Sequence, residues 1–293
     1  METPPDSPAP FARLGPSVPR LPLVVSVPHA GRMYPEALLA RTALPVATLA
    51  ALEDRHVDAL AAGLPALGVT TFVARTARAW IDLNRDEREI DPAMVTPCPR
   101  PATLIASAKV RGGLGLIPRR IAGAGEIASG RLRADEVAAR IAQDHRPWHD
   151  AIAAALAAAH ARFGVALLLD LHSMPSLAPG DGIAPPRLVI GDRHGRSAAT
   201  RFVTRMLDVA RAQGQPAARN APYAGGHTLD RHGRPESGIH AVQLEIDRAL
   251  YLAEDGRAPG MGLPAACRLV EAIASALLDE MGIPSGMAML AAE

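Results

Sequence analysis

Asp170 and His172 form a pair whose residue types and spacing suit chemistry. Five apolar residues, 165–169, precede them without a polar break. Such a run is typical of a strand buried on both faces, although periodicity alone also allows a buried helix. Residues two apart on a strand share one side, and in open α/β sheets ligands bind beyond the carboxyl ends of the strands. The pair is therefore a candidate site. The alternative is structural: Asp170 caps the next turn and His172 only forms a hydrogen bond.

Two further predicted strands deliver ionisable side chains in the same way. Leu21–Val27 is a β-rich run that ends at Pro28, because proline lacks the N–H that a sheet needs, and His29 follows. On the alternating strand His240–Ile246, Glu245 lies near the end. Two imidazoles and a carboxylate are a common ligand set for catalytic zinc, and a further carboxylate can act as the base for water. A metal hydrolase is therefore one hypothesis.

The carboxylate for such a site is expected from a predicted helix, Val46–Gly63. Glu53 falls within the apolar stripe of this helix, whereas Asp54 is turned by about 100° toward the edge of the stripe. A carboxylate in an apolar stripe is costly unless it is paired or binds a metal. Periodicity therefore makes Glu53 the more unusual of the two, and both stay candidates.

Asn84 and Arg85 stand at the end of a predicted short strand, Trp80–Asn84. An amide beside a planar guanidinium suits a bidentate grip on a carboxylate. A surface cluster of salt bridges is an equally good interpretation of this charged segment. Further along, Ser107–Arg120 is glycine-rich and basic, and we expect a flexible active-site loop in which Arg111 can reach an anion.

The remaining pattern alternates strands with helices, which predicts an α/β fold. Val69–Ala74 and Leu188–Ile190 are predicted strands, and Ser197–Ala212 is a predicted helix. A second long helix is predicted over Ala134–Phe163, with a break or kink near Pro147.

Other metal sites are not indicated. Cys98 and Cys267 have no CxxC spacing, so neither a disulfide framework nor a thiolate zinc site is expected. His145 and His149 lie four residues apart on a predicted helix, but no HExxH motif accompanies them.

Composition limits the class of protein further. A chain of 293 residues with 48% hydrophobic content can form one large α/β domain or two small ones. The net charge of +1 gives no general attraction to nucleic acid. No apolar run approaches the about 20 residues that span a bilayer, and the proline-rich N-terminus is not a secretory signal. We expect a flexible tail over residues 1–20, a single catalytic α/β domain over 21–293, no membrane partner and a cytoplasmic location.

Seven longer segments between about residue 21 and 255 form an ordered set of motifs, of which the last is long and specific. They are SVPHAG at 26–31, EDRHVD at 53–58, IDLNRDEREIDPAM at 81–94, KVRGGLG at 109–115, LLLDLHSMPS at 167–176, GDRHG at 191–195 and NAPYAGGHTLDRHGRPESGIHAVQLEIDRALYL at 220–252. In these segments and their order the sequence resembles the N-formylglutamate amidohydrolase family, whose fold is similar to that of zinc carboxypeptidases and aspartoacylases. The resemblance implies a three-layer α/β/α fold with a central mixed β-sheet.

The resemblance also implies a zinc site. Its ligands would be His29, His172 and a carboxylate, for which the family pattern favours Asp54 over Glu53. The implied cofactor is one Zn²⁺ per chain, with other divalent transition metals as alternatives.

Roles for the remaining candidates follow from the same resemblance. Asn84 and Arg85 would hold the α-carboxylate of a small-molecule substrate, and Glu245 would act as general base and then as acid. His227 and Arg111 would contact the substrate or its oxyanion. The implied reaction is hydrolysis of N-formyl-L-glutamate to L-glutamate and formate, a step of histidine degradation.

Two alternatives stay open. Related deformylases of histidine breakdown carry a different segment where this chain has SAKVRGGLGLIPRR, so a longer acyl-amino acid or a peptide C-terminus is a second substrate hypothesis. The other alternative is a non-catalytic homologue that binds metal or serves as a binding module. The sequence also leaves a homo-oligomer open.

Overall fold

The computed structural model describes residues 9–179 and 184–283, and these form two compact units. The first unit contains the described residues up to 12 together with 29–53 and 73–150. The second contains 13–28, 54–72 and the described residues from 151 onward. Most of both units lies within residues 21–293, the range expected to form a single domain, and residues 9–20 of the expected tail also belong to them. No composition shift marks a boundary, because the chain passes repeatedly from one unit to the other and no single linker separates them.

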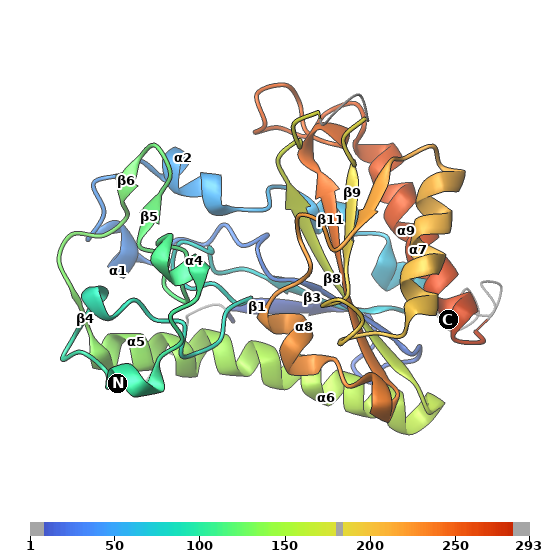
Figure 1. Ribbon diagram of the computed structural model, residues 1–293, viewed down its shortest axis with the longest axis horizontal. Coiled ribbons are helices and arrows are strands. Elements are labelled where there is room, and N and C mark those ends of the chain that lie inside the picture. The colour runs from blue at the N-terminus through green and yellow to red at the C-terminus, as the bar shows by residue number, and fades with distance from the viewer. Residues whose placement is uncertain (1–8, 180–183, 284–293) are drawn as a thin grey trace. The chain divides into compact units, whose positions relative to one another are not determined.

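A seven-stranded mixed sheet forms the centre of the second unit (Figure 1). In their order across the sheet, the strands are β1 (Phe11–Leu14), β3 (Thr70–Ala74), β2 (Leu23–Val27), β8 (Ala166–Met174), β11 (Ile239–Asp247), β9 (Leu188–Gly191) and β10 (Ala217–Arg219). Strands β2, β8 and β11 are parallel, β9 is antiparallel to β11, and β10 is parallel to β9. Every residue of β2 and β8 is buried, as continuous apolar runs predict for strands covered on both faces.

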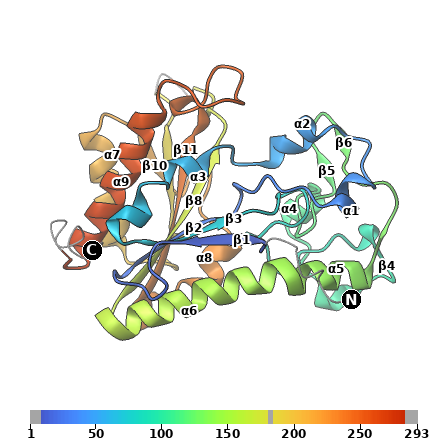
Figure 2. The ribbon, with the colours of Figure 1, turned by 180° about the vertical axis from the view of Figure 1, so that it is seen from behind.

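Helices cover both faces of this sheet (Figures 1 and 2). On one face, α7 (Thr200–Ala212) packs against β9, β10 and α9 (Leu263–Glu280), and α9 also contacts β2 and α3 (Val57–Leu60). On the other, α8 (His227–His232) packs against β8 and β11. The unit also contains the 3-10 turns η2 (Leu64–Leu67), η6 (Pro235–Ser237) and η7 (Arg248–Leu250). The predicted three-layer α/β/α arrangement around a mixed sheet is therefore confirmed.

The first unit is built from short elements. Its helices are α1 (Glu36–Leu39), α2 (Val46–Leu49), α4 (Ala108–Arg111) and α5 (Ala134–Arg140), and its 3-10 turns are η1 (Ala50–Leu52), η3 (Pro92–Met94) and η4 (Pro101–Thr103). Two strand pairs accompany them, β4 (Val95–Thr96) with β7 (Leu132–Arg133) and β5 (Arg120–Ile121) with β6 (Gly125–Glu126). A buried apolar cluster joins α1, α2, η1 and β5 and contains Leu38, Leu49, Leu52, Ala79, Ile121 and Ile127.

Helix α5 continues through a π-helical segment, Ile141–His145, into α6 (Arg146–Phe163). The π-helical segment ends two residues before Pro147. The break predicted near the middle of this helix therefore takes the form of a local change in helix type, which is one of the recognised causes of irregularity in long helices.

The continuous helix predicted over Val46–Gly63 is wrong. Helix α2 ends at Leu49 and the turn η1, which follows it, ends at Leu52. The backbone of Glu53 is then extended, with φ −74° and ψ 148°. His56 then adopts a left-handed conformation, with φ 59°, immediately before α3. The helical stripe that singled out Glu53 therefore does not exist.

Two other predictions differ from the structure. Trp80–Asn84 is not a strand. Its backbone amides bond individually instead of in a ladder: the Asp82 amide donates to the Leu116 carbonyl at 2.7 Å, and the Asn84 amide donates to the Asp82 carboxylate at 2.9 Å. Within the predicted tail, residues 11–14 form β1, an edge strand of the sheet, and residues 1–8 lie outside the described part of the chain.

Across residues 9–179 and 184–283, no helix combines the length and the apolar character that crossing a membrane requires.

Candidate active site

The parallel pairing of β8 with β11 brings two predicted site residues side by side in the second unit. In register, Glu245 lies next to His172 and Gln243 lies next to Asp170. Residues two apart on a strand share a face, so the four side chains project to the same side of the sheet. Gln243 Nε2 donates to Glu245 Oε1 at 2.9 Å, and this bond orients the Glu245 carboxylate.

The strand that carries His172 is longer than its apolar run suggests. Asp170 and His172 lie within β8, which continues to Met174, and both side chains are buried. The parallel partner β11 pairs with β8 along its whole length and so keeps the polar residues in the sheet. The two side chains are therefore held by a strand rather than by the loop after it.

The His172 imidazole lies between two carboxylates. Its Nε2 is 2.9 Å from Asp170 Oδ2, and its Nδ1 is 3.1 Å from Asp54 Oδ2. The other oxygen of Asp170 accepts a hydrogen bond from the Ser26 hydroxyl at 2.6 Å. Burial by itself lowers the pKa of His172, but the carboxylates of Asp170 and Asp54, together with Glu245, outweigh burial and raise this pKa well above its ordinary value.

This donor set fits a divalent metal ion. When Nε2–H donates to Asp170, Nδ1 of His172 carries the lone pair that a metal requires. Zinc–nitrogen and zinc–oxygen bonds of about 2.0–2.2 Å at tetrahedral angles separate two ligand atoms by roughly 3.4 Å. The 3.1 Å between His172 Nδ1 and Asp54 Oδ2 is close to that separation.

The positively charged side chain of Arg248 also holds Asp54 in place. Its Oδ1 accepts from Arg248 Nη2 at 3.0 Å, and Arg248 Nε donates to the Ser173 hydroxyl at 3.0 Å. Glu53, the neighbouring candidate, accepts a hydrogen bond from the Tyr34 hydroxyl. Of the two candidate ligands Glu53 and Asp54, it is thus Asp54 whose carboxylate lies beside His172.

In the first unit, Asp82 connects three of the predicted site residues. Its Oδ1 is 2.8 Å from His29 Nε2 and accepts from the Asn84 amide at 2.9 Å. Its Oδ2 accepts from Arg78 at 2.8 Å and lies 3.8 Å from Arg85 Nε. Burial by itself would raise the pKa of the Asp82 carboxyl. The positive charges of Arg78, His29 and Arg85 outweigh burial and hold this pKa well below its ordinary value.

His29 therefore has the same arrangement as His172. Its Nε2 faces a buried carboxylate, which leaves Nδ1 with the lone pair when Nε2–H is the donor. A histidine oriented by a carboxylate in this way is the usual ligand in zinc sites.

Asn84 and Arg85 are both nearly fully buried. Arg85 Nε donates to the Leu114 carbonyl at 2.9 Å, and Arg85 Nη1 donates to the Asn84 carbonyl at 2.7 Å. These bonds fix the direction of the guanidinium. The structure thus groups His29, Asn84 and Arg85 around Asp82 and does not leave the pair in a surface salt-bridge cluster.

The other two predicted residues, Arg111 and His227, lie on short helices. Arg111 is exposed at the end of α4, and its Nη1 donates to the Ala106 carbonyl at 2.6 Å. Within the predicted loop 107–120, residues 108–111 form a short helix capped by the Ser107 hydroxyl, and residues 112–119 form turns, bends and an isolated β-bridge. His227 is half-buried at the start of α8, the helix that packs against β8 and β11.

Three residues that interact with predicted site residues of their own unit are absent from the sequence-based prediction: Asp82 in the first unit, and Arg248 and Tyr223 in the second. Burial raises the pKa of the Tyr223 hydroxyl, and the charges of Glu245 and Asp54 raise it further, so this phenol stays protonated beside them. Tyr223 and Arg248 both lie in the segment 220–252 that carries the strongest resemblance, which was the available signal. Asp82 lies in the DLNR motif, where only Asn84 and Arg85 drew attention.

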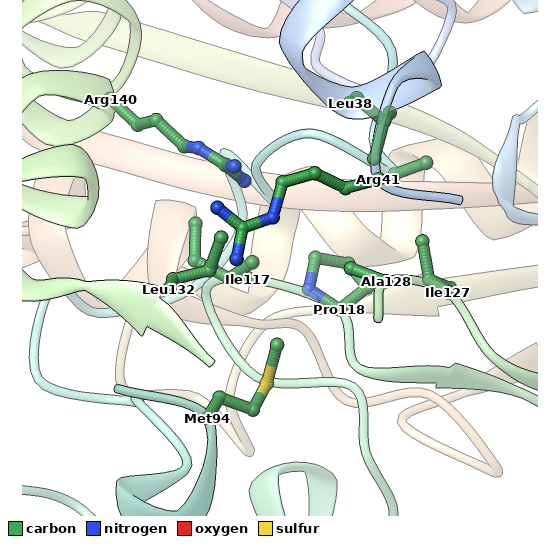
Figure 3. Close-up of a pocket in the computed structure, with 10 residues that line it drawn as sticks. Leu38, Arg41, Met94, Ile117, Pro118, Ile127, Ala128, Leu132 and Arg140 are labelled. Carbon is green, nitrogen blue, oxygen red and sulfur yellow. The ribbon is translucent and has the colours of Figure 1, made fainter. Parts of the chain in front are cut away.

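A small cavity in the first unit is not part of this site (Figure 3). Its volume is about 10 Å³, room for roughly one water molecule. Arg41 and Arg140 point into it among apolar side chains, and none of the predicted site residues lines it.

Comparison with known proteins gives a consistent result. A family model described as N-formylglutamate amidohydrolase matches residues 21–252. A protein of Pseudomonas aeruginosa named N-formylglutamate deformylase is 32% identical over 242 residues, which cover 80% of this chain and 84% of that protein. A protein of the same name from Pseudomonas putida is 33% identical over 242 residues, covering 80% and 83%.

Solved structures extend the similarity to the fold. The crystal structure of N-formylglutamate amidohydrolase from Ralstonia eutropha JMP134 has a TM-score of 0.85 at 34% identity and covers 94% of this chain and 98% of that one. A structure from Agrobacterium tumefaciens has a TM-score of 0.66 at 19% identity, covers 93% and 95%, and shares the fold.

Proposed function

The chain belongs to the N-formylglutamate amidohydrolase family, and we propose that it is a metal-dependent amidohydrolase that cleaves the amide bond of an N-acyl amino acid. The substrate we propose is N-formyl-L-glutamate, with L-glutamate and formate as products, because the relatives carry that activity in their names. The observation that carries the mechanism is the register of β8 with β11, which sets Glu245 beside His172 while His172 faces Asp54.

The proposed metal ligands are His29, Asp54 and His172, with one Zn²⁺ per chain or another divalent transition metal. Within the second unit, the 3.1 Å between His172 Nδ1 and Asp54 Oδ2 supports two of these ligands. Each histidine also has its Nε2 directed at a buried carboxylate, which leaves Nδ1 for the metal.

The bound metal would supply Lewis acidity, which lowers the pKa of water to about 7 and polarises the amide carbonyl. Glu245 accepts the proton of the attacking water and then donates it to the departing amine. Gln243 keeps the Glu245 carboxylate directed during both transfers. The C–N bond breaks as the amine takes up that proton.

The substrate carboxylate is assigned to Asn84 and Arg85, an amide and a guanidinium that together suit bidentate recognition. His227 and Arg111 are assigned contacts to the substrate or its oxyanion. We assign the reaction to histidine degradation in the cytoplasm.

The experiment measures hydrolysis and metal content on one preparation of purified protein. N-formyl-L-glutamate is compared with N-acetyl-L-glutamate, N-formyl-L-aspartate, N-formyl-L-leucine and a dipeptide, and formate or free amine is quantified. We expect about one zinc per chain and kcat/KM for N-formyl-L-glutamate at least tenfold above the others. Preference for another acyl group or side chain would overturn the substrate. Metal-loaded protein that hydrolyses none of the panel would instead indicate a non-catalytic metal-binding homologue.

A further inference from the structure

The segment that carries Asn84 and Arg85 has no regular secondary structure of its own. Residues 77–91 contain neither helix nor strand. Buried backbone carbonyls in such a segment need donors from elsewhere, because an unsatisfied buried carbonyl costs free energy. The donors determine which conformation the segment keeps.

Helix α6 and the π-helical segment before it supply two of these donors as histidines. His149 Nε2 lies 2.9 Å from the Leu83 carbonyl oxygen, and His145 Nε2 lies 2.8 Å from the Arg85 carbonyl oxygen. Because a carbonyl only accepts, both imidazoles carry a proton on Nε2. The two carbonyls belong to Leu83 and Arg85, the residues on either side of Asn84. The histidines therefore hold the backbone of the substrate-binding pair before and after Asn84.

The two histidines form one rigid group. Both are fully buried, and their ring centroids are 4.5 Å apart. The Arg146 amide bonds to the Ile141 carbonyl, five residues back, as in a π-helix. That turn contains one residue more than an α-helical turn. The extra residue changes the direction in which the helix presents His145 and His149.

Side chains of α5 and of the π-helical segment also hold the residues that precede Asn84. Asp144, also in the π-helical segment, accepts from the Thr76 hydroxyl at 3.0 Å and from the Trp80 indole at 3.1 Å. Arg140 Nη1 donates to the Trp80 carbonyl at 3.0 Å, and its guanidinium stacks 3.4 Å from the Trp80 ring centroid. The approach to Asn84 and Arg85 is thus fixed along its length by side chains of one helix.

We infer that His145 and His149 are positioning residues for recognition of the substrate carboxylate: by holding the Leu83 and Arg85 carbonyls, they keep the Asn84 amide and the Arg85 guanidinium in binding geometry. The inference rests on the proposed function, in which that pair binds the α-carboxylate. It concerns binding and not the chemical step, which the proposed mechanism assigns to Glu245.

The test compares two substitutions at each histidine. His145→Phe and His149→Phe keep a buried ring but remove the N–H donor, whereas His145→Gln and His149→Gln keep an N–H donor at a similar reach. Arg146→Gln is the matched control, because Arg146 lies on the same helix and contacts the same segment through Glu87, but at the surface, with 58% of its side chain exposed. Exposed ion pairs of this kind contribute little.

We expect each Phe variant to raise KM for N-formyl-L-glutamate about tenfold, the factor that corresponds to a loss of about 1.4 kcal/mol from a buried carbonyl without its donor. Metal content and kcat should stay within about threefold of wild type. The preference for N-formyl-L-glutamate over its α-carboxamide should fall by the same factor as KM rises. The Gln variants should recover most of both losses, and Arg146→Gln should match wild type.

A fall in kcat with unchanged KM and unchanged carboxylate preference would overturn the inference, as would Gln variants no better than the Phe variants. Should a Phe variant not fold, the wild-type protein labelled with ¹⁵N-histidine provides the readout. Two slowly exchanging Nε2–H signals should shift when N-formyl-L-glutamate is added and not when the α-carboxamide is added, and the absence of that difference would overturn the inference too. If wild-type protein shows no hydrolysis, the proposed function has failed, and the same comparison of variants is made with the dissociation constant of N-formyl-L-glutamate.

Discussion

Glu245 on β11 lies directly beside His172 on β8, one residue opposite the other in parallel register. Both side chains come from central strands rather than loops, so their separation is set by the sheet and changes little with loop motion. The hydrogen bond from Gln243 adds orientation to this fixed distance. In the proposed mechanism, Glu245 held this way beside His172 would be preorganised to act as the base for water at the metal.

The first prediction concerns Glu245→Gln. The amide preserves size and hydrogen bonding with Gln243 but cannot accept a proton from water. We expect kcat to fall by about 10²–10⁴, with zinc content and KM close to wild type. Formate release and metal analysis on the same sample measure both. Glu236→Gln is the control, because Glu236 is exposed on η6. Turnover near wild type in Glu245→Gln would remove Glu245 from the mechanism.

The second prediction separates two neighbouring acids. Asp54→Asn removes the charge that faces His172, so we expect bound zinc to fall below about one tenth per chain and activity to be lost with it. Glu53→Gln keeps an oxygen that can accept from Tyr34, and we expect full zinc content. Zinc per chain after dialysis against a weak chelator is the measurement. A zinc-loaded Asp54→Asn together with a zinc-free Glu53→Gln would reverse the assignment.

That choice between Glu53 and Asp54 shows where prediction from the sequence reaches its limit. The apolar runs of β2, β8 and β9 and the alternation of β11 predicted their strands, because burial on one or both faces leaves a local pattern. Alanine and leucine in Val46–Gly63 are good helix formers, so the pattern also predicted a helix there. The interruption depends on the extended backbone of Glu53 and the left-handed backbone of His56, which tertiary contacts impose and local propensity does not encode.

Asp82 escaped prediction for a related reason. Its partner His29 lies 53 residues earlier in the sequence, and a contact of that separation has no local signature. Trp80–Asn84 was predicted to be a strand, whereas the segment is shaped by donors from a helix that follows about sixty residues later along the chain. The residue types at the site, and Asp170 beside His172, could be found from the sequence, but the roles of Asp82 and of the histidines that hold the Asn84–Arg85 segment could not.

The third prediction tests Asp82 as the residue that orients His29. Asp82→Asn keeps an acceptor oxygen but removes the charge that balances Arg78 and Arg85. We expect zinc affinity to weaken by about 10–100-fold. We also expect KM for N-formyl-L-glutamate to rise, because the Asn84 amide and Arg85 share this carboxylate. Zinc affinity is measured by competition with a chromogenic chelator. Unchanged zinc affinity and unchanged KM would show that Asp82 only stabilises the fold, which thermal unfolding would register.

The fourth prediction concerns stability in acid and His240, far along β11 from Glu245. His240 is buried, its ring centroid is 4.8 Å from that of Phe202, and its Nδ1 accepts from the Ala199 amide at 3.4 Å. Burial, and next the positive charge of Arg201, lower the pKa of His240 to about 4. The unfolded chain has the ordinary histidine pKa of about 6.5, so between these values the unfolded state binds more protons.

These two pKa values determine how the free energy of unfolding changes with pH. The stabilising contribution of neutral His240 is fully present above pH 6.5 and is lost as the pH falls toward 4, at up to about 1.4 kcal/mol per pH unit. His240→Leu cannot titrate, so its free energy of unfolding should fall less steeply between pH 6.5 and 4 than that of wild type. Urea unfolding at several pH values in this range measures the slope. His194→Asn, at an exposed position with a left-handed backbone that asparagine tolerates, should keep the wild-type slope. Equal slopes in wild type and His240→Leu would mean that His240 is not held neutral by its surroundings, because only a difference in proton binding between the folded and unfolded states makes stability depend on pH.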